Sequence, residues 1–498
     1  MAVQTQRTLT ATVWVVALSL ASSAAAQTQA SLPSAPAAKL MAQLAREPVS
    51  PLPAATQQPS AGQSPGAQAP AGSAGAIPRG NVQDNAQSGP EQKLTRTQAE
   101  QMAIKNNPRV TVARLLALAQ HQIYRETRAA ELPTATASLT AVDAENASRI
   151  SAGSLTASRL FEHAGAGGGF SQLLTDFGRT RNLVKSSVLQ EKAQNANALA
   201  TQYDIELAAD QAFYSALQAE ETLKVAQENT AARQTLQSQV NQMTINKLKS
   251  TLDLSFANVN LSQAKLLELD AQNNADSTMA ALDNVLGLDH QVNFELVDDG
   301  ANIQQPPPDI DQLIQEGLHQ RPDLQATTFS QQAAVKFSRA QHDQLLPTIG
   351  AAGTVGIVPI RPDAYYVNNW WGGIGVNVNI PIFNGFLFTA QAKEASIRAQ
   401  AAAEQTRDLR DRIVRDVRTS WLEANTSYQK VSVTAELLQE ANLGLTLAQA
   451  RYKIGLSSIV ELSQAEYQQT DAAIQNANAQ YQYRLALATL NYQIGTEP

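Results

Sequence analysis

Cysteine is absent from this chain of 498 residues. The chain can therefore form no disulfide bond, use no thiol in catalysis and carry no lipid on a cysteine behind a signal sequence. Its five histidines are scattered along the sequence without the spacing of metal ligands. The formal net charge is only −7, and no basic run or alternation of basic and aromatic residues indicates nucleic acid. The sequence thus predicts a protein that is not an enzyme, with no cofactor, no metal and no nucleic-acid partner.

Long apolar runs are missing as well. The one short run, Leu9–Leu20, cannot cross a bilayer as a helix, and a mean hydropathy of −0.25 excludes a protein of many inner-membrane helices. The run follows Arg7 and precedes Ala24-Ala25-Ala26, an order typical of a secretory signal peptide. We therefore predict that residues 1–26 are a signal peptide that exports the protein, rather than a buried N-terminal helix.

The next segment, residues 27–93, is rich in alanine, proline, glutamine, glycine and serine and has few large apolar residues. Such a composition buries too little apolar surface to offset the entropy that ordering costs. We therefore predict that this segment is disordered and that the folded part begins at residue 94.

The folded part contains an internal duplication. Pro108 is followed 25 residues later by Pro133, and Pro322 is followed 25 residues later by Pro347. An offset of 208 residues maps Phe213 onto Trp421, Asp253 onto Glu461, Ala257 onto Ala465 and Gly287 onto Gly495. One register held over so many positions is typical of a repeat.

The two copies are predicted to be residues 94–300 and 309–498, joined by a linker at 301–308 that contains three prolines. Each copy has the same internal order. A helical stretch up to a Leu-Pro pair comes first, then a strand region with two strands, then two long helices.

The strands show as alternation of apolar with small or polar residues. Ile374, Val376, Val378, Ile380 and Ile382 alternate with Gly375, Asn377, Asn379 and Pro381. The other predicted strands cover 134–141, 349–357 and, most weakly, 168–177. A period of two over about ten residues suits a membrane-spanning strand with one face in lipid and one in water. Asn377 and Asn379 are then predicted to face the lumen of a barrel.

The helices are unusually long. No proline occurs between Phe386 and Gly455, and apolar residues recur there with a mean step of roughly 3.6 residues. A helix of about 70 residues rises about 100 Å. A second one is predicted at 179–249, with return helices at 251–287 and 458–494.

Four strands cannot close a barrel, and an open sheet edge in lipid leaves backbone groups unsatisfied. The chain is therefore predicted to lend its strands to an oligomer. Two chains would give a barrel of eight strands, and side chains fill the interior of such a barrel. Three chains would give twelve strands around a water-filled lumen. The sequence favours an α+β membrane protein that forms a homotrimer.

Several motifs follow one another in order along the two copies. They are Leu94-Thr95, Asn106-Asn107-Pro108 with its echo Gln320-Arg321-Pro322, the strand ends Leu174-Thr175-Asp176-Phe177-Gly178 and Ile380-Pro381-Ile382-Phe383-Asn384-Gly385, and the tip Arg451-Tyr452-Lys453-Ile454-Gly455-Leu456-Ser457. With these motifs the chain from about Leu94 to Gly495 resembles the TolC-like outer-membrane efflux proteins.

The resemblance implies a trimeric, twelve-stranded β-barrel in outer-membrane lipid that continues into a long periplasmic α-helical barrel. It also implies docking to a periplasmic adaptor (membrane fusion) protein and, through it, to an inner-membrane pump. The chain would be the passive duct of a tripartite efflux or type I secretion system. The alternative is a periplasmic coiled-coil adaptor or structural protein that does not span a membrane, although such a protein needs no barrel-length strands.

The resemblance also places the adaptor-docking turn at the tip, with Tyr452, Ile454, Gly455 and Leu456. By itself, Gly455 after a long helix is typical of a helix C-terminus in the left-handed conformation. The tip of the first copy, Asn246-Lys247-Leu248-Lys249, departs from this pattern because it has no glycine. For the first-copy tip the sequence thus allows two alternatives: either it does not dock the adaptor, or it docks through its lysines.

Two carboxylates occupy equivalent positions just past the tips. Asp253 and Glu461 would form a ring of six acids in a trimer, which would make the periplasmic mouth cation-preferring. Alternatively, Ser250 with Asp253 and Ser458 with Glu461 form helix caps. One carboxylate can serve both roles.

Four aromatic residues cluster between the strands of the second copy: Tyr365, Tyr366, Trp370 and Trp371. We predict that they lie in a loop and form an aromatic belt at the membrane interface. Packing within that loop is the alternative.

Overall fold

The computed structural model describes residues 92–143, 149–152, 155–159, 163–290, 292, 294–298, 303–360 and 369–496. These residues all belong to one compact unit, Asn85–Pro498. The predicted signal peptide and the predicted disordered segment as far as residue 91 lie outside the described residues. Strand β1 (Gln92–Leu94) begins two residues before the predicted start of the folded part, because its backbone pairs in parallel with β6 (Phe294–Leu296).

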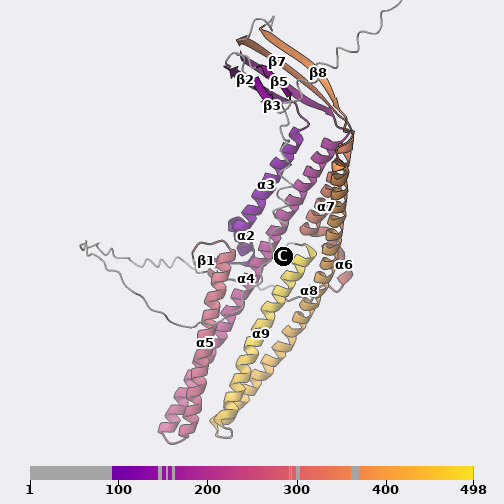
Figure 1. The fold of residues 1–498 in the computed structure, drawn as a ribbon. Coiled ribbons are helices and arrows are strands. Elements are labelled where there is room, and N and C mark those ends of the chain that lie inside the picture. Colours follow the sequence, from indigo (N-terminus) through magenta and orange to yellow (C-terminus); the bar gives the residue numbers. More distant parts are fainter. Residues whose placement is uncertain are drawn as a thin grey trace, which may run out of the picture. The chain divides into compact units, whose positions relative to one another are not determined.

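Long helices make up most of the unit (Figure 1). α4 (Arg179–Ile245) and α8 (Leu387–Lys453) have 67 residues each. α5 (Thr251–Val285) and α9 (Ile459–Ile494) return beside them. These bounds confirm the predicted long and return helices to within a few residues. Within the described part, none of the helices combines the length and the apolar character needed to cross a membrane.

The shorter helices meet at prolines. α2 (Arg96–Asn106) precedes α3 (Pro108–Ala129), and α6 (Ile310–Gln320) precedes α7 (Pro322–His342), which a short 3-10 turn η1 (Asp343–Leu345) follows. Proline fits the first turn of a helix but offers no N–H to continue the preceding one. The helical stretch predicted before each Leu-Pro pair is therefore two helices, because a proline interrupts it.

An antiparallel sheet joins strands of both copies. Its order is β2 (Thr134–Val142), β5 (His163–Thr175), β7 (Thr348–Ile360) and β8 (Trp370–Asn379). The register of β7 with β8 is continuous, from Thr348 opposite Asn379 to Ile357 opposite Trp370. The sheet therefore has β2 and β8 as its two edges.

The observed strands differ from the predicted ones in two bounds and in one additional hairpin. β5 begins before residue 168, because its glycine-rich start pairs with β2 and β7 on both sides. β8 ends at Asn379, and Pro381 beyond it has no N–H for the ladder. A separate hairpin of β3 (Arg149–Ala152) and β4 (Leu155–Arg159) was not predicted.

The contacts between helices follow one order. α4 contacts α3 and α5 of its own copy and α7 and α9 of the other copy, and α8 contacts α7 and α9. α3 and α5 therefore border the unit along one edge and α8 along the other (Figure 1). These edges continue those of the sheet, because β2 follows α3 in the chain and β8 precedes α8.

Two apolar cores fix the short helices to the long ones. In the first, Leu94 and α2 pack on Phe213 of α4 and Leu282 of α5. In the second, Leu313 and Ile314 of α6 pack on α8 and α9, where Ile413 and Val417 are fully buried. Burying each such side chain contributes about 1.5–3 kcal/mol. The elements that these two cores hold against the long helices, with the chain at 303–308, are here called the side layer: β1, α2, β6, α6 and 303–308.

Candidate functional site

One face of the four-stranded sheet is apolar and open to solvent. The register puts Ile374 opposite Gly353, which is opposite Phe170 in the next strand. The exposed apolar side chains of this face are Leu139, Phe170, Val355, Ile357, Trp370, Ile374, Val376 and Val378. The side chain of Ile374, for example, is 80% exposed. None of the four strands contains an aspartate, glutamate, lysine or arginine.

The opposite face carries hydroxyls, amides and glycines. Its polar residues are Thr134, Thr136, Ser138, Thr140, Ser171, Thr348, Thr354, Asn377 and Asn379. Asn377 pairs with Gly350 and Asn379 with Thr348, so both predicted lumen residues lie on this polar face. The sheet therefore separates a largely apolar surface, which also carries Gln172, from a polar one.

The two tryptophans are not in a loop but at the start of β8, where successive side chains point to opposite faces. Trp370 lies on the apolar face and is 65% exposed. Trp371 lies on the polar face, where a Cβ built on Gly356 would be 2.7 Å from its ring. The prediction that both form one belt is therefore corrected, because strand alternation allows only Trp370 on the apolar side. Tyr365 and Tyr366 lie outside the described residues.

The second-copy tip is a helix-ending turn. Gly455 has φ of +78°, its N–H donates to the carbonyl of Tyr452 at 3.1 Å, and the N–H of Leu456 donates to the carbonyl of Arg451 at 2.9 Å. This is the Schellman pattern, which satisfies the last carbonyls of α8. Ile454 and Leu456 are 70% and 69% exposed, so the turn presents two apolar side chains at the tip.

The first-copy tip makes the same turn without glycine. Lys247 has φ of +59°, its N–H donates to the carbonyl of Thr244 at 3.0 Å, and the N–H of Leu248 donates to that of Met243 at 2.9 Å. A left-handed conformation costs a non-glycine residue about 1–2 kcal/mol. The first-copy tip therefore follows the same backbone path although Lys247 stands where the second copy has glycine. Leu248 is exposed there, as Leu456 is in the second copy.

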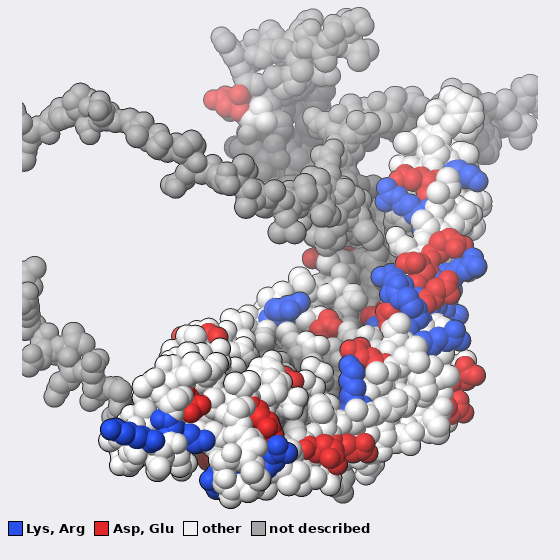
Figure 2. All heavy atoms as spheres, turned by 90° about the horizontal axis from the view of Figure 1, so that it is seen from below, with Lys and Arg blue, Asp and Glu red and all other residues white. Residues whose placement is uncertain are grey.

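Tyr452 supports the tip from inside and is not on its surface. It is 5% exposed and packs in a core with Val240 of α4, Ala257 of α5 and Leu462 of α9. The ammonium of Lys249 lies 4.2 Å from the centre of its ring. Seen from below, acidic and basic side chains are interspersed around this end of the unit (Figure 2).

The two equivalent carboxylates have different partners. The N–H of Asp253 donates to Ser250 Oγ at 3.2 Å, and Asp253 Oδ2 accepts from the N–H of Ser250 at 3.1 Å. This is a complete capping box. At the start of α9 only half of the box is present, because the N–H of Glu461 donates to Ser458 Oγ at 3.3 Å while its carboxylate lies 3.4 Å from Arg451 Nε.

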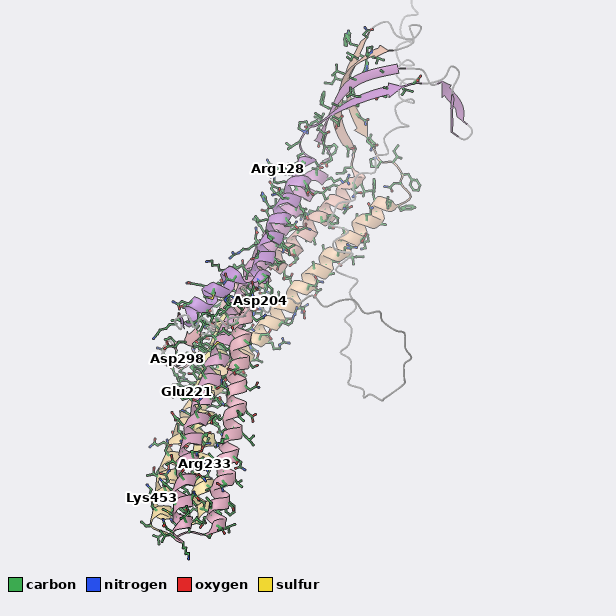
Figure 3. The ribbon with its side chains drawn as sticks, turned by 90° about the vertical axis from the view of Figure 1, so that its left-hand side faces the viewer. Arg128, Asp204, Glu221, Arg233, Asp298 and Lys453 are labelled. Carbon is green, nitrogen blue, oxygen red and sulfur yellow. The ribbon has the colours of Figure 1, made fainter. Side chains whose placement is uncertain are left out.

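Above the tips, a polar network joins the two helical hairpins. Arg233 of α4 donates to the carboxylate of Glu466 on α9, and these side chains are only 8% and 11% exposed. Asn229 Oδ1 accepts from Arg233 Nε and from Thr470 Oγ1, each at 3.2 Å. Arg233 lies toward the tip end that Lys453 marks (Figure 3). Sequence reasoning missed this network, because its partners are more than 200 residues apart.

A second charged cluster lies where α2 meets α4. Asp210 is fully buried, and Arg96 Nε lies 3.4 Å from its Oδ1 and 2.8 Å from Glu100 Oε1. Burial, together with the neighbouring Glu100 carboxyl, raises the pKa of Asp210 to about 8 against the lowering effect of Arg96. Across the part of the chain that the structure describes, no three acidic or histidine side chains are grouped to hold a metal ion.

The pKa of Asp210 predicts a pH dependence of stability. Its ordinary value is 3.8, so between about pH 4 and pH 8 the folded state holds a proton that the unfolded state has lost. The contribution of Asp210 to the free energy of unfolding is therefore fully present below its ordinary pKa of 3.8, and it is lost as the pH rises to about 8. D210N removes the titrating carboxyl but keeps the shape of the side chain. The unfolding temperature of purified D210N, measured at pH 5, 6.5 and 8, should therefore fall less with rising pH than that of the unmodified protein. An equally steep decline in D210N would contradict this assignment.

Comparisons with known proteins agree with the fold. The family model described as "Outer membrane efflux protein" matches residues 313–496. Outer membrane protein TolC of Salmonella enteritidis is 25% identical over 344 residues, which is 66% of this chain and 68% of that protein. The structure of CusC has a TM-score of 0.71 at 18% identity and covers 80% of this chain and 92% of CusC. The outer-membrane channel OprN has the same TM-score and identity and covers 81% of this chain and 91% of its own. The chain is thus similar to the TolC-like outer-membrane efflux proteins, the family that its motifs resemble.

Proposed function

We propose that the chain is one third of a passive duct through the outer membrane. The observation that carries this proposal is the sheet, whose register collects most of its large apolar side chains on one exposed face and most of its hydroxyl and amide side chains on the other. A strand between lipid and a water-filled lumen needs this division. A periplasmic coiled-coil protein, the alternative, has no use for an uncharged apolar sheet face.

The edges support closure by three copies. β2 and β8 have 9 and 10 residues, and neither has a further strand partner among the described residues. β8 of one copy can pair with β2 of the next in the antiparallel sense that the rest of the sheet follows. Twelve strands leave room for a lumen, whereas eight do not. Every backbone group of the barrel then has a partner within the lipid.

The helical edges match those of the sheet. Exposed apolar side chains line α3 and α5 on one edge and α8 on the other: Val112, Leu115, Leu116, Val259, Leu266 and Leu269, against Ile397, Val433, Leu437, Leu443 and Leu447. When copies close head to tail, these two edges meet and both are removed from water. The duplicated copies, 94–300 and 309–498 with the linker 301–308, would then give the helical barrel pseudo-sixfold packing.

The location and the partners of the chain are proposed from the family resemblance. The signal peptide at 1–26 would export the chain, and the barrel would sit in the outer membrane, without a lipid anchor, above a periplasmic helical barrel. The tips, with exposed Ile454 and Leu456 and the matching Leu248, would contact a periplasmic adaptor attached to an inner-membrane pump. Because both tips have the same turn, we include the first-copy tip in this docking surface.

Substitutions at Asp253 and Glu461 test whether the periplasmic mouth carries an acidic ring. Six carboxylates around a narrow opening would favour cations. In planar bilayers we expect E461Q to weaken the cation preference, and D253N added to it to weaken the preference further. Unchanged reversal potentials in the double variant would leave only the helix-capping role.

Reconstitution tests the function itself. The purified full-length protein should conduct ions in planar bilayers without nucleotide or other energy source, and it should fractionate with outer membranes. Recovery of the protein in the soluble periplasmic fraction without detergent would instead support the coiled-coil alternative and overturn the duct.

A further inference from the structure

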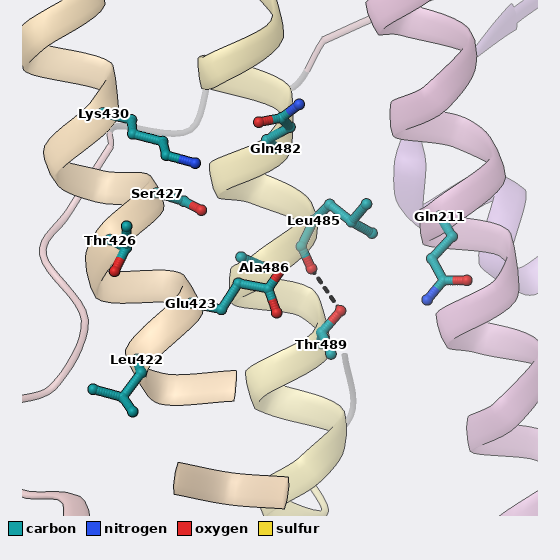
Figure 4. Close-up of a pocket in the computed structure, with 10 residues that line it drawn as sticks. All are labelled: Gln211, Leu422, Glu423, Thr426, Ser427, Lys430, Gln482, Leu485, Ala486 and Thr489. Atoms are coloured by element: carbon teal, nitrogen blue, oxygen red, sulfur yellow. Dashed lines mark hydrogen bonds between the residues drawn. The ribbon is translucent and has the colours of Figure 1, made fainter. Parts of the chain in front are cut away.

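The long helices carry a polar recess halfway along their length. It lies between α8 and α9 with α4 beside them and has a volume of about 420 Å³. Its polar lining includes Gln211 of α4, Glu423, Thr426 and Lys430 of α8, and Gln482 and Thr489 of α9. In Figure 4, Glu423 and Lys430 point from α8 toward α9, while Gln211 faces them from α4.

The two charged side chains of the recess are not used by the fold. Neither the Glu423 carboxylate nor the Lys430 ammonium has an ion pair or hydrogen bond with another described residue. Seven residues along a helix separate their Cα atoms by about 10 Å. The recess thus offers an anion and a cation two helical turns apart on α8, together with amides and hydroxyls.

The recess lies on the face of the helices opposite the side layer. On α8, Trp421 donates from Nε1 to the Pro307 carbonyl at 2.7 Å, and Lys430 follows it by nine residues, about 180° around the helix. On α4, Phe213 packs against α2, and Gln211 precedes it by two residues, about 200° around the helix. In a tube closed with the side layer on its outside, the recess faces the lumen.

We propose that this recess is a transient binding site for zwitterionic organic solutes about 10 Å long, with their cationic group at Glu423 and their anionic group at Lys430. The proposal rests on the proposed duct, because only a closed tube makes this face a lumen. Three such recesses would lie around one lumen. Exposed side chains in contact with water hold a solute weakly, as conduction requires, since a tightly held solute would not leave.

Triglycine is a suitable probe, because its terminal ammonium and carboxylate are about 10 Å apart when extended. We expect triglycine to reduce the single-channel current of the reconstituted protein, and N-acetyl-triglycine amide, which has no charge, to reduce it at least several-fold less. E423Q and K430Q should each raise the half-blocking triglycine concentration about three-fold or more. The charge-swapped variant E423K/K430E should restore block to within about two-fold, because a zwitterion can bind in the reverse direction.

Glu436→Gln serves as the matched control, since Glu436 is an exposed acid of α8 outside the recess lining, and its block should equal that of the unmodified protein. Equal block by the capped and uncapped peptides, or unchanged block in E423Q and K430Q, would overturn the recess while leaving the duct intact. Absence of any channel in the unmodified protein would instead refute the proposed function.

Discussion

Replacing Ile374 by arginine is expected to prevent the sheet from entering the membrane. Ile374 is 80% exposed at the middle of β8 on the apolar face. A lipid-facing arginine near the bilayer midplane costs about 2–4 kcal/mol, and a closed barrel of three copies would incur this cost three times. The amount of I374R recovered as assembled protein in outer-membrane fractions should therefore fall by at least ten-fold.

Asn377→Arg is the matched control on the same strand. Asn377 lies three residues from Ile374, on the opposite, polar face. A charge there would project into water, so N377R should assemble normally and change only the ion selectivity. Normal assembly of I374R, or equal losses in both variants, would show that the apolar face does not meet lipid.

Removing Arg233 is expected to loosen the helical hairpins near their tips. The R233A change leaves the buried Glu466 carboxylate without its cation, and breaking a buried pair in this way costs about 3–5 kcal/mol. Thermal unfolding in detergent should start at a clearly lower temperature, and amide exchange in α4 and α9 near these residues should speed up. Replacing both partners, as in R233M/E466M, should recover most of the loss, because no unpaired charge remains.

The same variant has an expected pH dependence. Burial raises the pKa of Glu466, and Arg233 opposes that shift. In R233A the opposing charge is gone, so the folded state binds a proton more readily than the unfolded state. The defect of R233A should therefore be smaller at pH 5 than at pH 8. A defect that is independent of pH, or no defect in R233A, would mean that the pair does not hold the hairpins together.

Local patterns predicted the long elements well. The absence of proline between Phe386 and Gly455 and the apolar ladder predicted α8, because a helix of this length needs only an unbroken local preference. Alternation predicted β2, β7 and β8 for the same reason. β5 was the weakest prediction, since its glycine-rich start has no side-chain pattern and is held in the sheet by its neighbours on both sides.

Features that depend on distant partners were not accessible from the sequence. The Arg233–Glu466 pair and the Asp210–Arg96 cluster join segments far apart in the chain, and no local signal marks either. Tyr452 was assigned to the docking surface because it belongs to the tip motif, yet the packing of α4, α5 and α9 buries it. The two tryptophans were assigned together, but the start of β8 turns them to opposite faces.

The number of chains in the purified assembly tests the account most directly. The four-stranded sheet has two open edges, and so does the row of helices beneath it. Native mass measurement of the full-length protein in detergent should therefore give a closed assembly of three copies. A stable monomer or dimer that still conducts ions would contradict the account, because neither can close a barrel with a water-filled lumen from four strands per chain.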